Sequence, residues 1–468
     1  MPARNRVGRV HVSKTIGPEP IEEAARYRIG LPMSTLRSRP SFTAPELREA
    51  LRELRRVDNR TNLLYLIGDY LTGAMIVAGA VAFAEWRLAL GLVWAWNVPV
   101  FVLAIVLLGG VLHRLAGLGH EAAHYSLLRN KFWNDLIADL FCFFPLCSSV
   151  HLYRVFHLAH HQYVNDPERD PDLVNLGRSK GVEHFPMTRG RFVRDYYLRL
   201  LLSPGQYLRY TWDYVYVNVF GKGGNIYMRR VSESDGHKVG LRLATWLGLA
   251  YLFGLGITLW ALMDAGASAR IWLVSASAWL GALGVLAVLP NRTIFQPPFR
   301  QPYSTRFSAA FRLGWWTLML ASLAQLGVIT DVWSIVYVFL LFVIPMSTSF
   351  FFYMLLRDIY QHTNADQDRI TNTRVFYADP FTRWAVFVHG QGYHTPHHLF
   401  PAIPHYRLDE LHRVLKQWNP EYAERVVECQ GTFANRSGLP TILDVLTIPA
   451  ERSELRISDC ELRISENK

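Results

Sequence analysis

The chain has 468 residues, of which 50% are hydrophobic and only 19% are charged, yet its formal net charge is +11. Aromatic residues make up 13% of the chain, far more than a disordered or nucleic-acid-binding tail protein would contain, so that class is excluded. Strong basic charge in an apolar chain indicates that the cations are segregated from the hydrophobic segments, as in a multi-span membrane protein. We expect no nucleic-acid partner.

Six stretches are long and apolar enough to cross a bilayer, which takes roughly 20 helical residues. Only the first contains a charged residue, Asp69, and only Asp331 separates the last two. The sequence therefore predicts an all-α, multi-span helical membrane protein with four to six transmembrane helices. The predicted spans are residues 63–84, 91–112, 243–263, 271–290, 313–330 and 332–356.

The basic residues indicate the orientation of the chain. If all six stretches span the membrane, Arg87 and Arg270 are the only two of the 49 lysines and arginines on one side. Positively charged loops favour the cytoplasmic side. All 17 histidines fall on the cation-rich side, so we expect both termini and any histidine chemistry to be cytoplasmic.

Domain boundaries follow from these spans. Residues 1–62 are predicted to form a cytoplasmic tail, residues 63–420 a membrane domain, and residues 421–468 a partly disordered C-terminal tail. A cytoplasmic helical cap is expected from residues 113–242 and 357–420. In the N-terminal tail, a helix near residues 43–56 has a stripe of leucines that could either lie on anionic headgroups or pack against the cap. The stripe is Leu47, Leu51 and Leu54.

Three histidine clusters carry the chemistry. Residues three or four positions apart share one face of a helix, so each cluster can direct its imidazoles toward a common point. Pro396 predicts that the third cluster starts a helix or lies in a turn. Eight histidines from three segments suit two metal ions better than one. The clusters are His120 and His124; His157, His160 and His161; and His394, His397 and His398.

Spacing alone leaves the metal open, because imidazole ligands suit iron, zinc, copper and nickel. The first cluster also reads HEAAH, the HExxH string of zinc metallopeptidases, in which Glu121 would be the general base. That string uses only two of the eight histidines, so an intramembrane zinc protease is a distant alternative. A metal transporter would need polar ligands at mid-bilayer depth, and the spans offer little besides Asp69 and Asn97.

Around these clusters, the chain resembles the integral-membrane fatty acid desaturase family, whose histidine boxes have the forms HxxxH, HxxHH and HxxHH. The resemblance covers roughly residues 60–420. It is strongest in GHEAAHYSLLRN (residues 119–130), FHLAHHQYVNDPERDPD (156–172) and YHTPHHLFPAIPHYRL (393–408).

The resemblance implies an oxidoreductase with a non-haem di-iron centre that uses O₂ and two electrons to introduce a double bond into a fatty acyl chain. The acyl chain would be presented as a lipid, an acyl-CoA or an acyl-carrier ester. Electrons would come from a separate donor of the ferredoxin or cytochrome b5 type. Related membrane hydroxylases and carotenoid- or sphingolipid-modifying oxygenases use similar boxes and remain alternatives.

The resemblance also implies a ninth ligand, His362, upstream of the third box. His389 is a weaker competitor for that role. Asp358 stands where acyl-CoA desaturases have an asparagine that holds a water near one iron, so it could bind metal, hold a water or pair with Arg357 or Arg369. Carboxylates near the boxes could orient the ligand rings. The candidates for this supporting role are Glu121, Asp166 and Asp170, besides Asp358.

Overall fold

The structure is a computed structural model that describes most of the chain between residues 42 and 447. It covers residues 42, 44–178, 187–199, a few positions between 200 and 234, and residues 235–332, 334–435 and 437–447. Residues 1–41 and 448–468 of the predicted tails lie outside the described residues. Much of the predicted cap between 179 and 234 lies outside them as well.

Six helical segments of the described chain are long and apolar enough to cross a membrane. This confirms the predicted all-α, multi-span membrane fold, at the upper end of the predicted number of spans. The segments are α2 (Thr61–Ala89), η3 with α3 (Trp94–Ala123, where α3 is Asn97–Ala123), the Leu243–Asp264 part of α11 (Asp235–Asp264), α12 (Ser268–Val288), α13 (Thr305–Thr330) and Ser334–His362.

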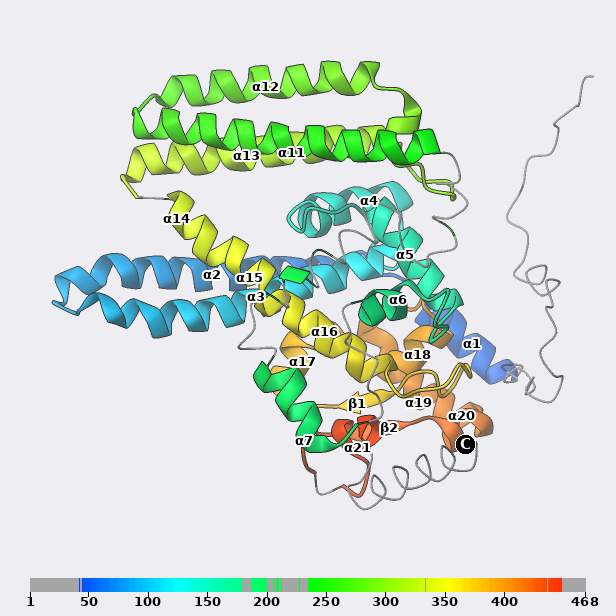
Figure 1. Cartoon of the computed structure of the whole chain (residues 1–468). Helices are drawn as coiled ribbons and strands as arrows, with labels where there is room; N and C mark the ends of the chain where they lie inside the picture. Colours follow the sequence, from blue (N-terminus) through cyan, green and yellow to red (C-terminus); the bar gives the residue numbers. More distant parts are fainter. Residues whose placement is uncertain are drawn as a thin grey trace, which may run out of the picture. The chain divides into compact units, whose positions relative to one another are not determined.

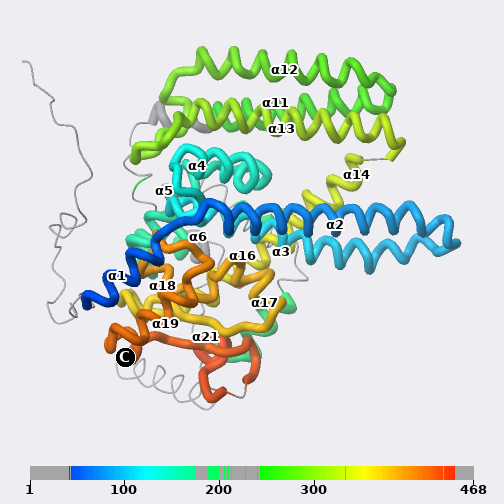
Figure 2. Tube along the Cα trace, turned by 180° about the vertical axis from the view of Figure 1, so that it is seen from behind, coloured from blue at the N-terminus to red at the C-terminus, as the bar shows by residue number. Residues whose placement is uncertain are grey.

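The spans form two kinds of packing unit. Helices α2 and α3 lie side by side as a hairpin, and α11, α12 and α13 all contact one another as a three-helix bundle (Figures 1 and 2). Leu259, Ile271 and Ala321 are buried between the three helices, whereas large apolar side chains such as Phe253 and Val288 are exposed. Exposed apolar faces of this kind suit contact with lipid chains.

The sixth segment is a broken helix. It runs through α14 (Ser334–Val338), the π-helical turn η7 (Phe339–Val343), α15 (Ile344–Ser347) and α16 (Ser349–His362). The π-turn and Pro345 both interrupt the regular hydrogen-bond ladder, which accounts for the break. Because α13 ends at Thr330 and Asp331 adopts a left-handed conformation with φ of 53°, the fifth and sixth segments are separate helices.

Helices α3 and α16 cross at very close range. A Cβ atom at Gly109 would lie only 2.7 Å from the backbone nitrogen of Phe350, so only glycine allows this approach. The hydroxyl of Ser349 donates a hydrogen bond of 2.6 Å to the carbonyl oxygen of Ile105 at the same crossing. The crossing brings the continuations of these two helices together beyond the membrane-spanning region.

Both helices extend past the predicted ends of their spans. The apolar stretches end at residues 112 and 356, but α3 continues to Ala123 and α16 to His362. Hydropathy marks where the apolar surface ends, whereas packing against neighbouring elements keeps the helix going through residues that include Gly117 and Gly119. These extensions place His120 and His362 at the ends of membrane-spanning helices.

The remaining elements form the cap around these helix ends (Figure 1). The cap contains α1 (Pro45–Leu54), α4 (Lys131–Ala138), η4 (Asp139–Phe143), α5 (Val150–Gln162), α6 (Pro171–Arg178), α7 (Arg189–Phe192), η5 (Val193–Leu198), α17 (Pro380–Ala385), α18 (His394–Leu399), η8 (His405–Arg407), α19 (Leu408–Trp418), α20 (Pro420–Arg425) and α21 (Ile442–Leu446). A short turn, η6 (Asn291–Thr293), lies between α12 and α13 in the chain and contacts α11 of the three-helix bundle. Two short parallel strands, β1 (Val375–Tyr377) and β2 (Glu428–Gln430), pair with Phe376 opposite Cys429.

The predicted C-terminal tail begins at residue 421, but residues 421–447 form part of this cap. Tyr422, Cys429 and Leu443 are buried in α20, β2 and α21, respectively. The sequence-based boundary is therefore too early, because the apolar residues after 420 are spaced too irregularly to predict that they pack. The repeated ELRIS segments lie beyond the described residues.

The leucine stripe of α1 packs within the protein. Leu47, Leu51 and Leu54 are all buried, and they share a core with Leu411 and Leu415 of α19. Of the two roles considered for this amphipathic helix, packing against the cap is the one that the structure shows.

Because Leu47 is completely buried, we expect Leu47→Ala to destabilise the protein by about 3 kcal/mol. The measurement is thermal unfolding of the detergent-solubilised chain, followed by tryptophan fluorescence. Arg52→Ala on the exposed face of the same helix is the control and should change stability by less than about 0.5 kcal/mol. Equal, small effects of both changes would mean that the stripe does not pack as described.

Candidate metal centre

The nine histidines singled out in the sequence lie together in two groups of ring nitrogens. Within each group, the candidate ligand atoms lie within 4.8 Å of one another. The first group is His120, His124, His157, His161 and His397, and the second group is His160, His362, His394 and His398.

Helix geometry explains how the boxes divide between the groups. His157 and His161 are one turn apart on α5 and both join the first group, whereas His160 points to the second. On α18, His394 and His398 are one turn apart and join the second group, whereas His397 joins the first. Adjacent residues on a helix project about 100° apart. Each consecutive histidine pair therefore supplies one ring to each group.

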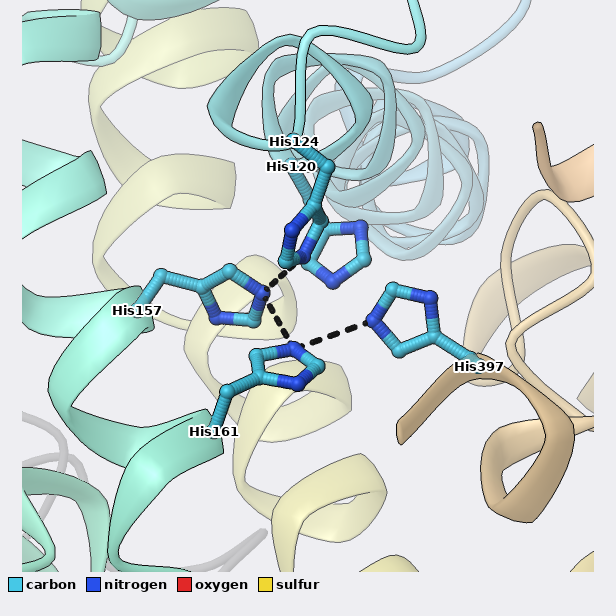
Figure 3. A group of neighbouring side chains, drawn as sticks. All are labelled: His120, His124, His157, His161 and His397. Carbon is cyan, nitrogen blue, oxygen red and sulfur yellow. Dashed lines mark hydrogen bonds between the residues drawn. The ribbon is translucent and has the colours of Figure 1, made fainter. Parts of the chain in front are cut away.

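The rings of the first group converge through their Nε2 atoms (Figure 3). The Nε2 atom of His157 lies 2.7 Å from that of His124 and 2.9 Å from that of His161. The Nε2 atoms of His161 and His397 are 3.2 Å apart. The Nε2 atom of His120 is buried and has no hydrogen-bond partner among the described residues.

These distances fit a shared metal ion. Two imidazole nitrogens bound at about 2.1 Å and at right angles would lie about 3.0 Å apart. Hydrogen bonds alone cannot satisfy the cluster, because each neutral imidazole nitrogen offers either one proton or one lone pair, while His157 Nε2 has two close nitrogen neighbours. The all-nitrogen donor set and the partnerless Nε2 of His120 both fit a bound transition-metal ion.

The second group has the same character and adjoins the first. The Nε2 atom of His394 lies 2.9 Å from that of His362 and 3.0 Å from that of His398. The rings of His161 and His398, one from each group, stack with their centroids 4.2 Å apart. The centre can therefore hold two neighbouring metal ions.

Burial keeps most of these rings neutral. It lowers the pKa of His124 to about 3, with a further contribution from the nearby Arg154. Burial, together with the neighbouring imidazoles, also lowers the pKa of His157, His161 and His394 well below 6.5. Since only the neutral ring binds metal, the centre is ready to accept ions at neutral pH.

His160 is the exception, because two carboxylates face it. Its Nδ1 lies 2.9 Å from Asp170 and 3.4 Å from Asp172. Burial alone would lower the pKa of His160, but these two carboxylates outweigh it and raise the pKa to about 9. At neutral pH the metal-free ring is therefore protonated on both nitrogens, and a metal ion must displace the Nε2 proton. The Nδ1 proton, held by Asp170, makes the ring a more basic ligand.

The other predicted supporting carboxylates make their hydrogen bonds to groups other than the proposed ligand rings. Asp166 accepts hydrogen bonds from the backbone and side chain of Arg169, so it organises its own loop. Glu121 accepts hydrogen bonds of 2.9 Å from the Ser126 hydroxyl and from the backbone N–H of His405. Its second oxygen lies 3.5 Å from His120 Nδ1, too far for a good hydrogen bond.

Two further candidates also fall outside the groups of converging nitrogens. Asp358 pairs with Arg357 at 2.9 Å, which is one of the three roles considered for it. His389 lies 3.0 Å from Asp69, the one charged residue of the predicted spans, and belongs to neither group. His389 also adopts a left-handed conformation, with φ of 46°.

The side chain of Gln391, which was not among the predicted site residues, supports His120. The side chain of Gln391 lies 3.1 Å from His120 Nδ1, and Gln361 donates a hydrogen bond of 2.9 Å to the Gln391 carbonyl oxygen. Both glutamines are buried. No sequence signal pointed to Gln391, because its distance from His120 is set by the fold and not by spacing along the chain.

The fold and this centre define a helical integral membrane protein with clustered histidines that can bind metal. A model of the fatty acid desaturase family matches residues 94–293 and 288–429, well over half of the chain. The chain therefore belongs to the fatty acid desaturase family, whose members are oxidoreductases.

Three desaturases show partial similarity. A dihydrorhizobitoxine desaturase of Bradyrhizobium elkanii is 37% identical over 129 residues, or 27% of this chain and 33% of the relative. An sn-1 oleoyl-lipid 12-desaturase of a Picosynechococcus species is 30% identical over 148 residues, 30% of this chain and 39% of the relative. A Delta(8)-fatty-acid desaturase of Euglena gracilis is 32% identical over 76 residues, 16% of this chain and 18% of the relative. Each match spans less than half of the relative's length.

Proposed function

We propose that this protein is an O₂-dependent di-iron desaturase that introduces a double bond into a fatty acyl chain. The observation that carries the proposal is the pair of adjoining groups of buried imidazole nitrogens at the ends of apolar helices. Membership of the fatty acid desaturase family supports the same reaction. The names of the three relatives favour desaturation over the hydroxylase and oxygenase alternatives.

The proposed ligands divide as the two groups do. One iron would be held by His120, His124, His157, His161 and His397, and the other by His160, His362, His394 and His398. When bound, the two ions supply the activation of O₂ that removes two hydrogen atoms from the chain, with two electrons from a donor. Five of the nine histidines are buried, which limits access of bulk water to the ligands, and Asp170 holds the Nδ1 proton of His160.

We also propose that the centre and both termini face the cytoplasm, since the cations and histidines share one side of the predicted topology. A separate donor of the ferredoxin or cytochrome b5 type would then reach the cap from the cytoplasm. The substrate class is an acyl chain carried as a lipid, a CoA ester or an acyl-carrier ester. One relative is named for dihydrorhizobitoxine, so products are to be measured in both lipid and aqueous extracts.

The zinc-protease alternative is not supported by the position of Glu121. A general base must reach the water that attacks the substrate. One Glu121 oxygen accepts from Ser126 and His405, and the other faces Nδ1 of His120 and not the Nε2 atom that would bind metal. The HExxH string also leaves the second group of histidines without a role.

Expression of the chain in a host with a defined lipid profile tests the function. We expect a new unsaturated product that depends on O₂, detected by mass spectrometry of lipid and aqueous extracts. The same culture expressing His160→Ala should form none, since that change removes a proposed ligand. We further expect about two iron ions per purified chain. An O₂-independent product, or a His160→Ala chain as active as the original, would contradict the proposal.

A further inference from the structure

Two buried arginines close the ends of the two helices that bring histidines to the centre from the membrane. Arg154 lies at the end of α3 and Arg374 at the end of α16, and only 2% and 3% of their surfaces are exposed. We propose that Arg154 and Arg374 are positioning residues, each of which holds one metal position by fastening one helix end. The inference rests on the proposed two-metal centre.

Arg154 uses every one of its donors. Its Nε and Nη2 donate to the carbonyl oxygens of Ala123 and Ala122 at 3.0 and 2.9 Å. Its two Nη atoms also donate to the two oxygens of Asp135 at 2.9 and 2.6 Å, and Nη1 donates to Gln301 at 2.5 Å. A guanidinium has five N–H groups, so all of them are engaged.

These contacts fix α3 against α5. Ala122 and Ala123 lie between His120 and His124 in the last turn of α3, and Arg154 is three residues before His157 on α5. The last carbonyls of a helix lack partners within it. Arg154 donates to the Ala123 carbonyl oxygen, and it shares the Ala122 carbonyl oxygen with Asn134. Both histidines at this end of α3 belong to the first group, whereas α5 also carries one second-group ligand, His160. Loss of the contact should therefore displace ligands of the first position more than those of the second.

Arg374 makes the corresponding contacts at the end of α16. Its Nη1 donates to the carbonyl oxygen of Tyr360 at 2.9 Å, and its Nη2 to those of Thr363 and Asn364 at 2.8 Å each. The neighbouring Thr373 hydroxyl donates to the Gln361 carbonyl oxygen at 2.9 Å. These carbonyls surround His362, which belongs to the second group.

The arginine also contacts the start of α18. The backbone N–H of Thr395, next to His394, donates to the Arg374 carbonyl oxygen at 3.4 Å. Burial lowers the pKa of Arg374 to about 10, so the group is still charged at neutral pH. The partial negative charge at a helix C-terminus favours a cation there. Arg374 therefore contacts the end of α16 and the start of α18, which carry the second-group ligands His362 and His394. Arg154 contacts the end of α3, which carries first-group ligands.

Lysine substitutions test this division because lysine keeps the charge but lacks the planar fork that reaches several carbonyls at once. Two reference proteins each retain one position: His157→Ala/His161→Ala removes the first, and His394→Ala/His398→Ala removes the second. Arg154→Lys and Arg374→Lys are placed in each reference. The affinity of the purified full chain for Fe²⁺ is then measured anaerobically against a chromophoric chelator.

We expect a crossed pattern. Arg154→Lys should weaken Fe²⁺ binding about 10- to 100-fold where only the first position remains and less than about 3-fold where only the second remains. Arg374→Lys should do the reverse. A variant damaged only in its general fold would lose both positions alike, so each arginine is the matched control for the other.

Equal weakening of both positions by either lysine, or no weakening, would overturn the inference. If a lysine variant fails to fold, Gln301→Ala and Thr373→Val remove one anchor each and should give the same crossed pattern with smaller shifts. An original chain that binds fewer than two Fe²⁺ ions would refute the two-metal centre itself, and the inference with it.

Discussion

Replacing His157 and His161 together by alanine should leave a protein that binds about one iron per chain and forms no product. Both rings belong to the first group, and each of its close Nε2–Nε2 contacts involves one of them. Their removal leaves three imidazoles without these contacts. Replacing His394 and His398 should likewise remove the second position, because only His160 and His362 remain there. Neither single remaining ion should support desaturation, since both positions are required for the proposed chemistry.

The informative comparison is with a double substitution that changes one histidine from each group. His160 and His397 come from different boxes and different groups. Changing both should therefore weaken both positions without eliminating either, whereas a same-group pair should leave the other position with its original affinity. Iron content and chelator competition on the purified chain measure the difference.

His412→Gln is the matched control for these changes. His412 is buried like the ligands, but it bonds to Tyr422 at 2.7 Å and lies 3.1 Å from Glu428. It belongs to neither group, so its replacement should affect stability and not iron content. Equal loss of iron from every pair would mean that the centre holds its ions as a single unit and that the division into two groups is wrong.

The sequence predicted the members of this centre but not their division. The spacing HxxHH places three rings near one face of a helix, which indicates a common target. It does not reveal that the middle ring, His160, turns away from His157 and His161, since that depends on where α16 and α18 lie. His362 became a candidate only through the family resemblance, because a single histidine at the end of an apolar stretch has no distinguishing pattern of its own.

Supporting contacts were the least predictable part. Asp170 could be proposed because it follows His160 closely in the sequence, and the same reasoning proposed Asp166, which pairs with Arg169 instead. Gln391 reaches His120 from a distant segment, so only the fold reveals it. The spans were located by hydropathy, but the helical extensions of α3 and α16 were not, because hydropathy ends where the lipid-facing surface ends.

Acid should unfold the iron-free protein well before it unfolds the iron-loaded protein. Burial, with neighbouring charges, depresses the pKa of six ligand rings below 6.5 in the metal-free fold. These rings are His124, His157, His161, His394, His397 and His398. Below pH 6.5 the unfolded chain binds protons that the folded chain cannot, so stability falls as the pH falls.

The expected effect is large. Each depressed ring costs about 1.4 kcal/mol per pH unit below 6.5, and a typical protein has only about 5–15 kcal/mol of stability in total. The iron-free chain should therefore unfold between about pH 6 and pH 5. Bound iron should delay unfolding, because anything that binds only the folded state stabilises it. Tryptophan fluorescence and circular dichroism across a pH series, with and without iron, measure the two midpoints.

His160 should act in the opposite direction at alkaline pH. The pKa of His160 is raised to about 9 by Asp170 and Asp172 despite burial, so its contribution to stability is complete below pH 6.5 and is lost as the pH rises through 9. Asp170→Asn should reduce this alkaline loss. Because it removes stability that is complete below pH 6.5, it should also move the acid midpoint to a higher pH. An iron-free chain equally stable at pH 5 and pH 7 would show that the ligand rings are not held neutral by burial, and the preformed character of the centre would have to be abandoned.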